Sequence, residues 1–426
     1  MRMQNYDYAD FAILYRTNAQ SRILEEALRK RGIPYKIYGG LSFYQRKEVK
    51  DVISYLRLIV NPHDEEAFKR VINYPARGIG DTTLNKLVVA ATDHNVSLWT
   101  VLNDPIGYAL PVNNGTAKKL SDFRELISGF IERNIKLSAE EIAAAVVKES
   151  GIVSTLFQDR SVEGISKQEN LQELLKGIAE FCEIRREEGM EHVSLADFLS
   201  EVSLLTDQDN DKEEQANKVT MMTVHAAKGL EFRNVFVVGL EEDLFPSAMS
   251  KDNPRAVEEE RRLFYVAITR AEENCVLTHA RSRYRNGQST MCSPSRFLKD
   301  IDPKYIYTSA DAVTTDGLLA TRRSSVFQQP KAMEGEAYVS PVAQAVGRQA
   351  RLTRMETASL SPAPSSSSAP ALSGLHVGAK VRHDRFGEGE VTAIEGEGGN
   401  AKATVSFAHF GQKQLLLKFA RLTIVE

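Results

Sequence analysis

The sequence predicts an α/β fold in which a parallel sheet is interrupted by a large helical insertion and followed by a linker and a small β-barrel. Residues 11–15 are expected to form a buried strand and residues 35–38 the next one, with an amphipathic helix between them. A strand, a helix and a strand within about 30 residues form a βαβ unit, so these strands are expected to be parallel. From about residue 47 to residue 217 the pattern is almost wholly helical.

The first predicted helix has recognisable ends, because Asn18 can cap its N-terminus and Gly32 can end it. Amphipathic helical segments continue through the insertion at 120–134, 139–149 and 169–187. The sheet pattern then returns in strands at 219–224, 234–239 and 275–279, with a helix at 256–270 before the last of them. We therefore expect one α/β domain whose sheet is completed only after the insertion.

The chain after about residue 308 has a different character. Residues 361–371 are rich in Ser, Ala and Pro, which predicts a flexible linker. Short β segments separated by glycines follow at 379–383, 389–394, 402–408 and 413–419. A small, independent β-barrel is therefore expected at the C-terminus.

The composition sets few limits on function. The 426 residues carry a formal net charge of −3, so no global basic field indicates a nucleic-acid partner, although a local basic track would suffice for phosphate contacts. Cys182, Cys275 and Cys292 have no metal-binding spacing, which predicts a reduced, cytoplasmic protein without a cysteine metal site. Neither a signal peptide nor a membrane span is predicted.

One loop carries several chemically useful side chains. The segment Thr223-Val-His-Ala-Ala-Lys-Gly-Leu-Glu-Phe232 begins where a predicted strand ends, at the kind of sheet edge where open α/β sheets bind ligands. It offers His225, Lys228 and Glu231, and Gly229 permits a turn between them. A solvated loop explains the same residues, so their chemistry leaves both interpretations open.

The second candidate is the predicted helix Glu258-Glu-Glu-Arg-Arg-Leu-Phe-Tyr-Val-Ala-Ile-Thr-Arg270. Arg262 and Thr269 lie seven residues apart and therefore share one face of this helix. Arg270 comes at its end, from where a guanidinium could reach a transferring phosphoryl group of a neighbouring domain. A surface helix with i,i+3 and i,i+4 charge pairs accounts for the same pattern.

Together these two segments resemble motifs V and VI of superfamily 1 helicases of the UvrD/PcrA/Rep family. Leu14-Tyr-Arg-Thr-Asn-Ala-Gln-Ser-Arg22 is similar to the head of that family's second RecA-like domain. Gly39-Gly-Leu-Ser-Phe-Tyr-Gln-Arg-Lys-Glu-Val-Lys-Asp51 and Arg77-Gly-Ile-Gly80 are similar to the beginning of its helical insertion. Gly378-Ala-Lys-Val-Arg-His-Asp-Arg-Phe-Gly-Glu-Gly-Glu-Val391 is similar to the Tudor-like domain of PcrA-type members.

The resemblance implies five parts in the chain. The second RecA-like (P-loop NTPase-type) domain begins at residues 1–46 and continues at 218–308, and the helical insertion lies between, at 47–217. A flexible linker follows at 309–375, and an SH3/Tudor-like barrel at 376–426.

In this family ATP lies between two RecA-like domains, which implies nucleotide contacts from both motifs. Arg270 would contact the γ-phosphate as an arginine finger, the catalytic role expected of this chain. Glu231 and Gly229 would belong to the ATP-binding residues, with Glu231 at the sugar.

The resemblance also implies contacts with single-stranded DNA. His225 and Lys228 would couple the nucleotide to the DNA strand, and Arg16 and Asn18 would contact that strand as well. Arg16 also fits the simpler interpretation of an ordinary exposed arginine.

The resemblance implies two further DNA contacts, for which the residues themselves give weaker evidence. The turn formed by Arg77, Gly78, Ile79 and Gly80 would grip duplex DNA through backbone N–H groups before a capped helix, although Gly-x-Gly before a helix is common. Relatives carry an aromatic residue before a glycine where this sequence has Asn286-Gly287, so either Tyr284 stacks on a base instead or that contact is lost.

The sequence has no Gly-x-x-x-x-Gly-Lys-Ser/Thr segment, and it lacks the family's Gln-Asn-Tyr-Arg motif. Asp64-Glu65 is the only Asp-Glu candidate for holding Mg²⁺, and Asp64 fits better as a helix cap. We therefore expect a chain that begins inside the second motor domain. ATP would be its cofactor, the Mg²⁺ ligands would come from a missing N-terminal RecA-like half, and the chain alone would not hydrolyse ATP.

The implied function is the C-terminal motor half of an ATP-dependent 3′-to-5′ DNA helicase that unwinds duplex DNA in repair or replication. The alternative is a non-catalytic protein that binds DNA or docks on RNA polymerase. A helicase–nuclease fusion is disfavoured, because no acidic cluster on a strand follows residue 308. The resemblance also makes RNA polymerase the expected partner of the barrel, whose mixed surface charges favour protein over DNA.

Overall fold

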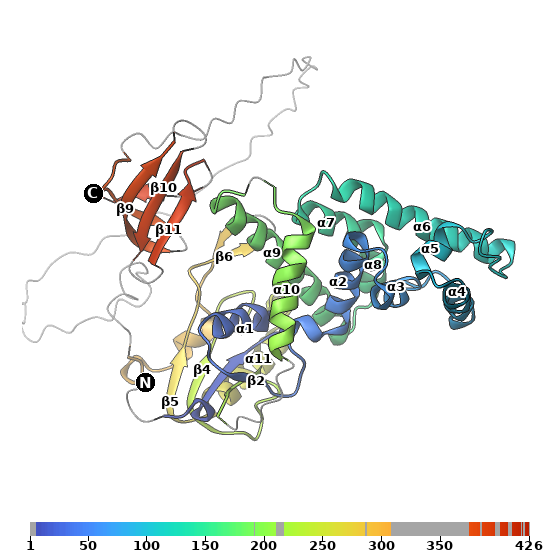
Figure 1. Cartoon of the computed structure of the whole chain (residues 1–426). Helices are drawn as coiled ribbons and strands as arrows, with labels where there is room; N and C mark the ends of the chain where they lie inside the picture. The colour runs from blue at the N-terminus through green and yellow to red at the C-terminus, as the bar shows by residue number, and fades with distance from the viewer. Residues whose placement is uncertain are drawn as a thin grey trace, which may run out of the picture. The chain divides into compact units, whose positions relative to one another are not determined.

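The computed structural model describes residues 6–190, 192–209, 217–285, 288–307, 375–383, 386–396, 401–407, 411–418, 420 and 422–425. It shows an α/β fold with a large helical part and a small β domain (Figure 1). Among the helices in these ranges, none is long and apolar enough to cross a membrane. Most of the predicted linker, up to residue 374, lies outside the described residues.

The first structural layer is a five-stranded sheet with the order β2-β3-β1-β4-β5, and every pairing in it is parallel. Its strands are β1 (Phe11–Tyr15), β2 (Tyr35–Ile37), β3 (Val219–Thr223), β4 (Phe232–Val237) and β5 (Ala271–Leu277). The central strands β1 and β3 are largely buried, as expected of a parallel sheet covered on both faces. The predicted βαβ unit and the late return of the sheet are both confirmed.

Several predicted boundaries differ from the observed ones, and two of these differences have a clear structural cause. Asn18 does not cap the first helix, because the Oε1 of Gln20 accepts the backbone N–H groups of Arg16 and Thr17, each at 2.9 Å, and folds the chain into a 3₁₀ turn. That turn is η3 (Asn18–Gln20), and α1 (Ser21–Lys30) follows it. Strand β5 begins at Ala271 rather than at 275, because its polar first residues still pair with β4.

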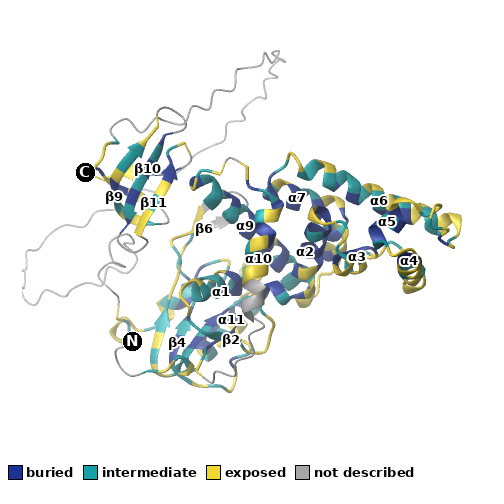
Figure 2. Ribbon diagram, viewed as in Figure 1, coloured by how far each residue is buried: buried dark blue, intermediate teal, exposed yellow. Residues whose placement is uncertain are grey.

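The insertion consists of helices that share one core, to which each of them contributes buried side chains (Figure 2). They are α2 (Lys47–Val60), α3 (Glu65–Val71), α4 (Asp81–His94), α5 (Leu98–Asn103), α6 (Asn114–Asn134), α7 (Ala139–Glu149), α8 (Ile152–Gln158), α9 (Val162–Glu187) and α10 (Leu195–Asp209). Asp64 caps α3, as predicted, by accepting the Ala67 N–H at 3.0 Å.

Helix α11 (Pro254–Ile268) follows β4 and leads into β5. Phe264 anchors its buried face, with its ring 6.0 Å from that of Phe245 and 5.7 Å from that of Phe297. A short hairpin of β6 (Ser282–Arg285) and β7 (Gln288–Met291) comes after the sheet.

The C-terminal β domain is a five-stranded antiparallel sheet with the order β11-β10-β9-β8-β12. Its strands are β8 (Lys380–His383), β9 (Gly387–Glu395), β10 (Lys402–Phe407), β11 (Gly411–Leu416) and β12 (Leu422–Ile424). Gly389 is required in β9, because a Cβ there would lie 2.6 Å from the Phe407 ring and 2.8 Å from Val405. Strand β9 can therefore pass this close to Phe407 and Val405 only because residue 389 has no side chain.

Candidate nucleotide and nucleic-acid site

Arg270 meets the loop between β3 and β4 at the amino-terminal ends of β4 and β5. Its carbonyl accepts the Phe232 N–H at 2.9 Å, and its Nη1 donates to the Leu230 carbonyl at 3.0 Å. Glu231 lies between these two contacts and is exposed. Gly229, which has a φ of 87°, completes the turn in a conformation that other residues rarely adopt. The contacts of Arg270 with Leu230 and Phe232 thus bring the three residues predicted to bind nucleotide together, although Arg270 is far from the other two in the sequence.

The Arg270 guanidinium is held at the C-terminus of its own helix. Its Nε donates to the Val266 carbonyl at 3.0 Å, and its Nη2 donates to the Thr269 hydroxyl at 3.1 Å. A cation is favoured there, because it offsets the partial negative charge of the last helical carbonyls. No carboxylate in the described part of the chain forms a salt bridge with Arg270, so its charge can still meet an anion.

His225 and Glu231 lie at opposite ends of the strands of the sheet. The loop starts at the carboxyl end of β3 and must reach the amino end of β4, because both strands run parallel to β1. Val224 donates its N–H to the Tyr15 carbonyl at 2.9 Å, which places His225 beside the carboxyl end of β1. The exposed Lys228 lies on the loop between the two edges.

Arg16 follows β1 at this carboxyl edge, and its guanidinium is already engaged by a buried carboxylate. Its Nη2 donates to Glu260 Oε1 at 2.6 Å, and its Nε donates to Glu260 Oε2 at 2.9 Å. The pKa of His225 is lowered, first because partial burial penalises the charged imidazolium and then because Arg16 repels it, while Glu260 opposes the shift. These three side chains therefore form one electrostatic cluster.

Asn18 is turned toward the insertion. Its Nδ2 donates a long hydrogen bond of 3.5 Å to Ser166 on α9, and its carbonyl accepts from Arg46 at 2.7 Å. The weak contact with Ser166 leaves the amide of Asn18 free to exchange partners.

A cavity of about 660 Å³ lies at the same carboxyl edge. Sequence reasoning missed several of its lining residues, although they directly follow strands β4 and β5 in the way Arg16 follows β1. These residues are Val238, Gly239, Thr278 and His279. Their position after a strand was the available signal, but their side chains form no recognisable motif.

The turn at residues 77–80 is built around an arginine that faces inward. The Arg77 guanidinium donates to the Tyr55 hydroxyl at 2.7 Å and to backbone carbonyls that include Ser150 at 3.1 Å. Ile79 is also buried, at 1% exposure. Only the glycines, Gly78 and Gly80, are exposed in the turn, so any ligand would meet main-chain groups.

Backbone geometry prepares this turn. The Asn73 Oδ1 accepts the N–H groups of Arg77 and Ile79 at 2.9 and 3.1 Å, and Gly78 has a φ of 68°. Gly80 occupies the cap position of α4 without a side-chain acceptor, so the first N–H groups of that helix stay uncapped. Lys119 donates to the Gly78 carbonyl at 3.2 Å and brings a positive charge to the turn.

Tyr284 lies in β6 opposite Ser289. Its side chain, like the whole of Asn286-Gly287, lies outside the described residues, so the predicted base-stacking contact stays a prediction.

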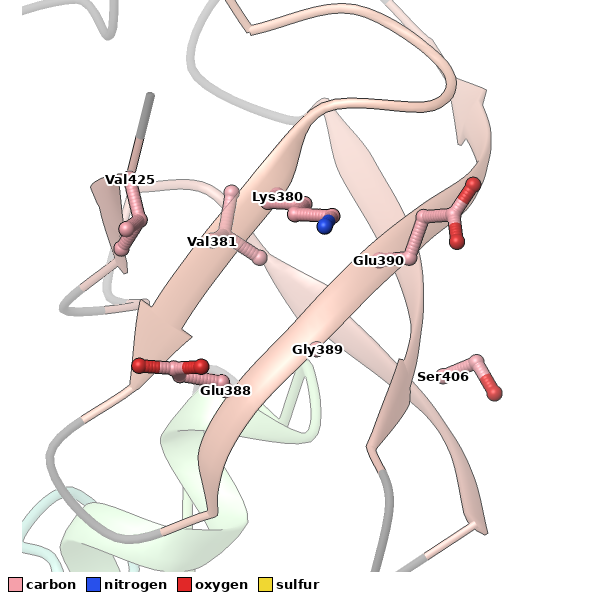
Figure 3. A pocket seen from close by; sticks show the side chains of 7 residues that line it. All are labelled: Lys380, Val381, Glu388, Gly389, Glu390, Ser406 and Val425. Atoms are coloured by element: carbon pink, nitrogen blue, oxygen red, sulfur yellow. The ribbon is translucent and has the colours of Figure 1, made fainter.

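The β domain has a groove of about 300 Å³ across β8, β9 and β10 (Figure 3). Lys380 stands opposite Glu390 in the strand register, and Glu388 lies further along the same strand. The groove floor is Gly389, beneath which the core ring of Phe407 lies. One lysine and two glutamates along the groove suit a polypeptide better than a uniformly anionic backbone.

The chain thus combines a parallel sheet interrupted by a helical insertion with an available arginine at one end of the sheet and a cavity at the other. The sequence matches the family model of the UvrD-like helicase C-terminal domain over residues 1–282, and that of the PcrA/UvrD Tudor domain over residues 377–423. The chain belongs to the UvrD-like helicase family.

Curated relatives agree with this assignment. The chain is 36% identical to the ATP-dependent DNA helicase PcrA of Staphylococcus epidermidis over 98% of this chain and 52% of the relative. It is 36% identical to DNA helicase II of Escherichia coli, and 37% identical to PcrA of Staphylococcus aureus, again over 52% of each relative. The chain thus spans about half the length of the curated relatives it matches.

Proposed function

We propose that this chain is the C-terminal part of the motor of an ATP-dependent 3′-to-5′ DNA helicase, which unwinds duplex DNA in the cytoplasm during repair or replication. The observation that supports this most is the junction of Arg270 with Leu230 and Phe232. It sets beside the exposed Glu231 an arginine that has no carboxylate partner among the residues that the structure describes. We propose five parts. A RecA-like domain is formed by two segments, 1–46 and 218–308, and the insertion between them covers 47–217. A linker at 309–375 and a Tudor-like barrel at 376–426 follow.

At the amino-terminal end of the sheet, this chain would offer ATP one hydrogen-bond donor and one acceptor side chain. Arg270 would leave its helix-end carbonyls and stabilise charge on the transferring phosphoryl group. Glu231 would accept hydrogen bonds from the sugar hydroxyls, and Gly229 would let the backbone turn between them. In this proposal, a first RecA-like domain supplies the P-loop and the Mg²⁺ ligands. The relatives are about twice as long as this chain, which is enough for one more such domain.

The carboxyl edge is the proposed path of single-stranded DNA. His225, Lys228, Arg16 and Asn18 would contact the strand there, and Tyr284 would stack on a base. In the insertion, the main chain of Gly78 and Gly80 would receive a phosphate of the duplex. Arg77 and Ile79 would hold that turn in shape, because their side chains point into the core.

The barrel is proposed as a docking module for RNA polymerase, which is also the function left if the motor were inactive. The mixed charges of its groove support a protein partner. Residues 374–426 should be titrated with RNA polymerase and, separately, with duplex DNA. Tight binding to DNA without binding to polymerase would reject the docking role.

The motor proposal is tested by phosphate release. We expect the chain alone to release no phosphate from ATP, with or without single-stranded DNA. Joined to the N-terminal half of a relative, it should become a DNA-stimulated ATPase. Hydrolysis by the isolated chain that Arg270→Ala abolishes would overturn the division of the site between two domains.

A further inference from the structure

The ion pair between Arg16 and Glu260 joins two parts of the motor domain that the proposed function uses separately. Arg16 is the first residue after the central strand β1, at the carboxyl edge of the sheet. Glu260 belongs to α11, the helix whose end carries Arg270. The pair therefore connects the proposed DNA edge to the helix that presents the proposed arginine finger.

Arg16 and Glu260 are joined by paired hydrogen bonds. Two guanidinium nitrogens of Arg16 donate to the two carboxylate oxygens of Glu260, which fixes the relative orientation of both groups as well as their separation. The side chain of Glu260 is 7% exposed, and Ser250 contributes a further contact at 3.5 Å. A carboxylate this deeply buried needs its partner, because an unpaired buried charge is strongly unfavourable.

Arg16 can also face outward while it holds Glu260. Its side chain is 21% exposed, and no acceptor for its Nη1 is found in the described residues. A phosphate oxygen could approach that nitrogen without displacing the carboxylate. Any movement of Arg16 toward such a phosphate would then be transmitted to Glu260.

Helix α11 can carry that movement to its other end. Its buried face contacts the core mainly through Val257, Phe264 and Ala267, so Glu260 and the aromatic contacts of Phe264 fix how the helix lies on the sheet. An α-helix transmits a displacement as a rigid rod over the few turns between Glu260 and Arg270. A small rotation about Phe264 would change how Arg270 contacts the Leu230 carbonyl.

We propose that Glu260 is a positioning residue, which through its paired hydrogen bonds with Arg16 links DNA at the carboxyl edge of the sheet to the orientation of α11 and Arg270. The proposal rests on the proposed function. Glu260 contacts neither DNA nor nucleotide, and it acts only through Arg16 and its own helix.

The test uses the chain itself, with a single-stranded oligothymidylate as the probe. DNA affinity is measured by fluorescence anisotropy, and amide hydrogen exchange is followed at residues 264–271 with and without the probe. In the unchanged chain we expect the probe to slow exchange there by about fivefold or more, the size that a coupling of about 1 kcal/mol gives. Glu260→Gln should bind the probe within about threefold of the unchanged chain, yet lose this slowing.

Two further variants complete the test, one as a matched control and one as a second way to break the paired hydrogen bonds. Glu259→Gln is the matched control, because Glu259 sits on the same helix but is 68% exposed and pairs only with Arg262 at the surface; it should keep the slowing. Arg16→Lys retains the charge at the DNA edge but cannot form the two parallel bonds. It should therefore bind the probe more weakly, and at saturating probe it should lose the slowing, even if Glu260→Gln proves poorly folded.

The outcomes separate the inference from the function on which it rests. Probe binding that slows exchange in both Glu260→Gln and Arg16→Lys as in the unchanged chain overturns the positioning role alone. Probe binding by the unchanged chain with no slowing at 264–271 has the same consequence. Failure of the unchanged chain to bind the probe removes the proposed DNA edge, and the inference falls with it.

Discussion

The turn at residues 77–80 and the end of α11 each contain an arginine that donates to main-chain carbonyls, yet the two are used differently. Arg77 binds the Tyr55 hydroxyl and carbonyls from separate parts of the insertion, and it lies over the rings of Tyr55 and Phe123. Among the described residues, Arg270 donates to the end of its own helix and to the Leu230 carbonyl of the loop before β4. Arg77 is enclosed by acceptors from several segments and by two aromatic rings, and it supports the fold. Arg270 makes fewer contacts, and it remains available to a ligand.

The largest expected effect concerns Arg270. In a complete motor that includes a first RecA-like domain, Arg270→Ala should lower kcat about 10³-fold, as loss of an arginine finger does. The thermal unfolding of the chain should change little, because the helix-end carbonyls can be solvated instead. Arg262→Ala is the control, since Arg262 is 76% exposed on the same helix. A loss of less than about tenfold in kcat would assign Arg270 a structural role like that of Arg77.

For Arg77 we expect the main effect of substitution to be on stability. Arg77→Ala should destabilise the insertion by about 2–3 kcal/mol, because several buried acceptors lose a charged donor. Urea unfolding followed by circular dichroism at 222 nm, a signal that comes mainly from helices, measures this loss. Arg77→Lys should recover only part of it, because one ammonium cannot reach all the acceptors. Unfolding indistinguishable from that of the unchanged chain would contradict the scaffold role.

A smaller effect should distinguish the exposed glycines of the turn from its inward-facing arginine. Gly78→Asp combined with Gly80→Asp should weaken duplex DNA binding about tenfold at low salt, because carboxylates would repel the phosphate that the backbone N–H groups attract. Gly32→Asp is a matched control, since Gly32 has a φ of 62° and Gly78 one of 68°, so both substitutions cause similar backbone strain. Unchanged duplex affinity in the double variant would reduce the turn to a helix start.

The smallest effect concerns Arg16, a third arginine, whose partner is a carboxylate instead of carbonyls. The pKa of His225, followed by NMR, should lie below its ordinary value of 6.5. Glu260→Gln should lower the pKa further, because the carboxylate supports the imidazolium, whereas Arg16→Gln should raise it by removing a repelling charge. An unchanged pKa in both variants would show that His225 lies outside this cluster.

Periodicity and motif order were sufficient to predict the sheet, the insertion and the small β domain. They could not predict the environment of each arginine, because Arg16, Arg77 and Arg270 all follow or precede similar patterns of strand, turn and helix. Which of them faces a ligand depends on acceptors far away in the sequence, such as Glu260 for Arg16 and Ser150 for Arg77. The separation of His225 from Glu231 follows from the parallel direction of β3 and β4, which a linear motif conceals.

The sheet order has a consequence for how the chain folds. Strands β2 and β3 are neighbours in the sheet, although the whole insertion lies between Ile37 and Val219. Closing a disordered loop of this length would cost about 2 kcal/mol more than closing an ordinary crossover, and the search for the partner strand would be slow. We expect the helices of the insertion, which share a core of their own, to form first and to shorten the effective loop. Refolding should then be biphasic, with core substitutions in α2 slowing even the recovery of the sheet.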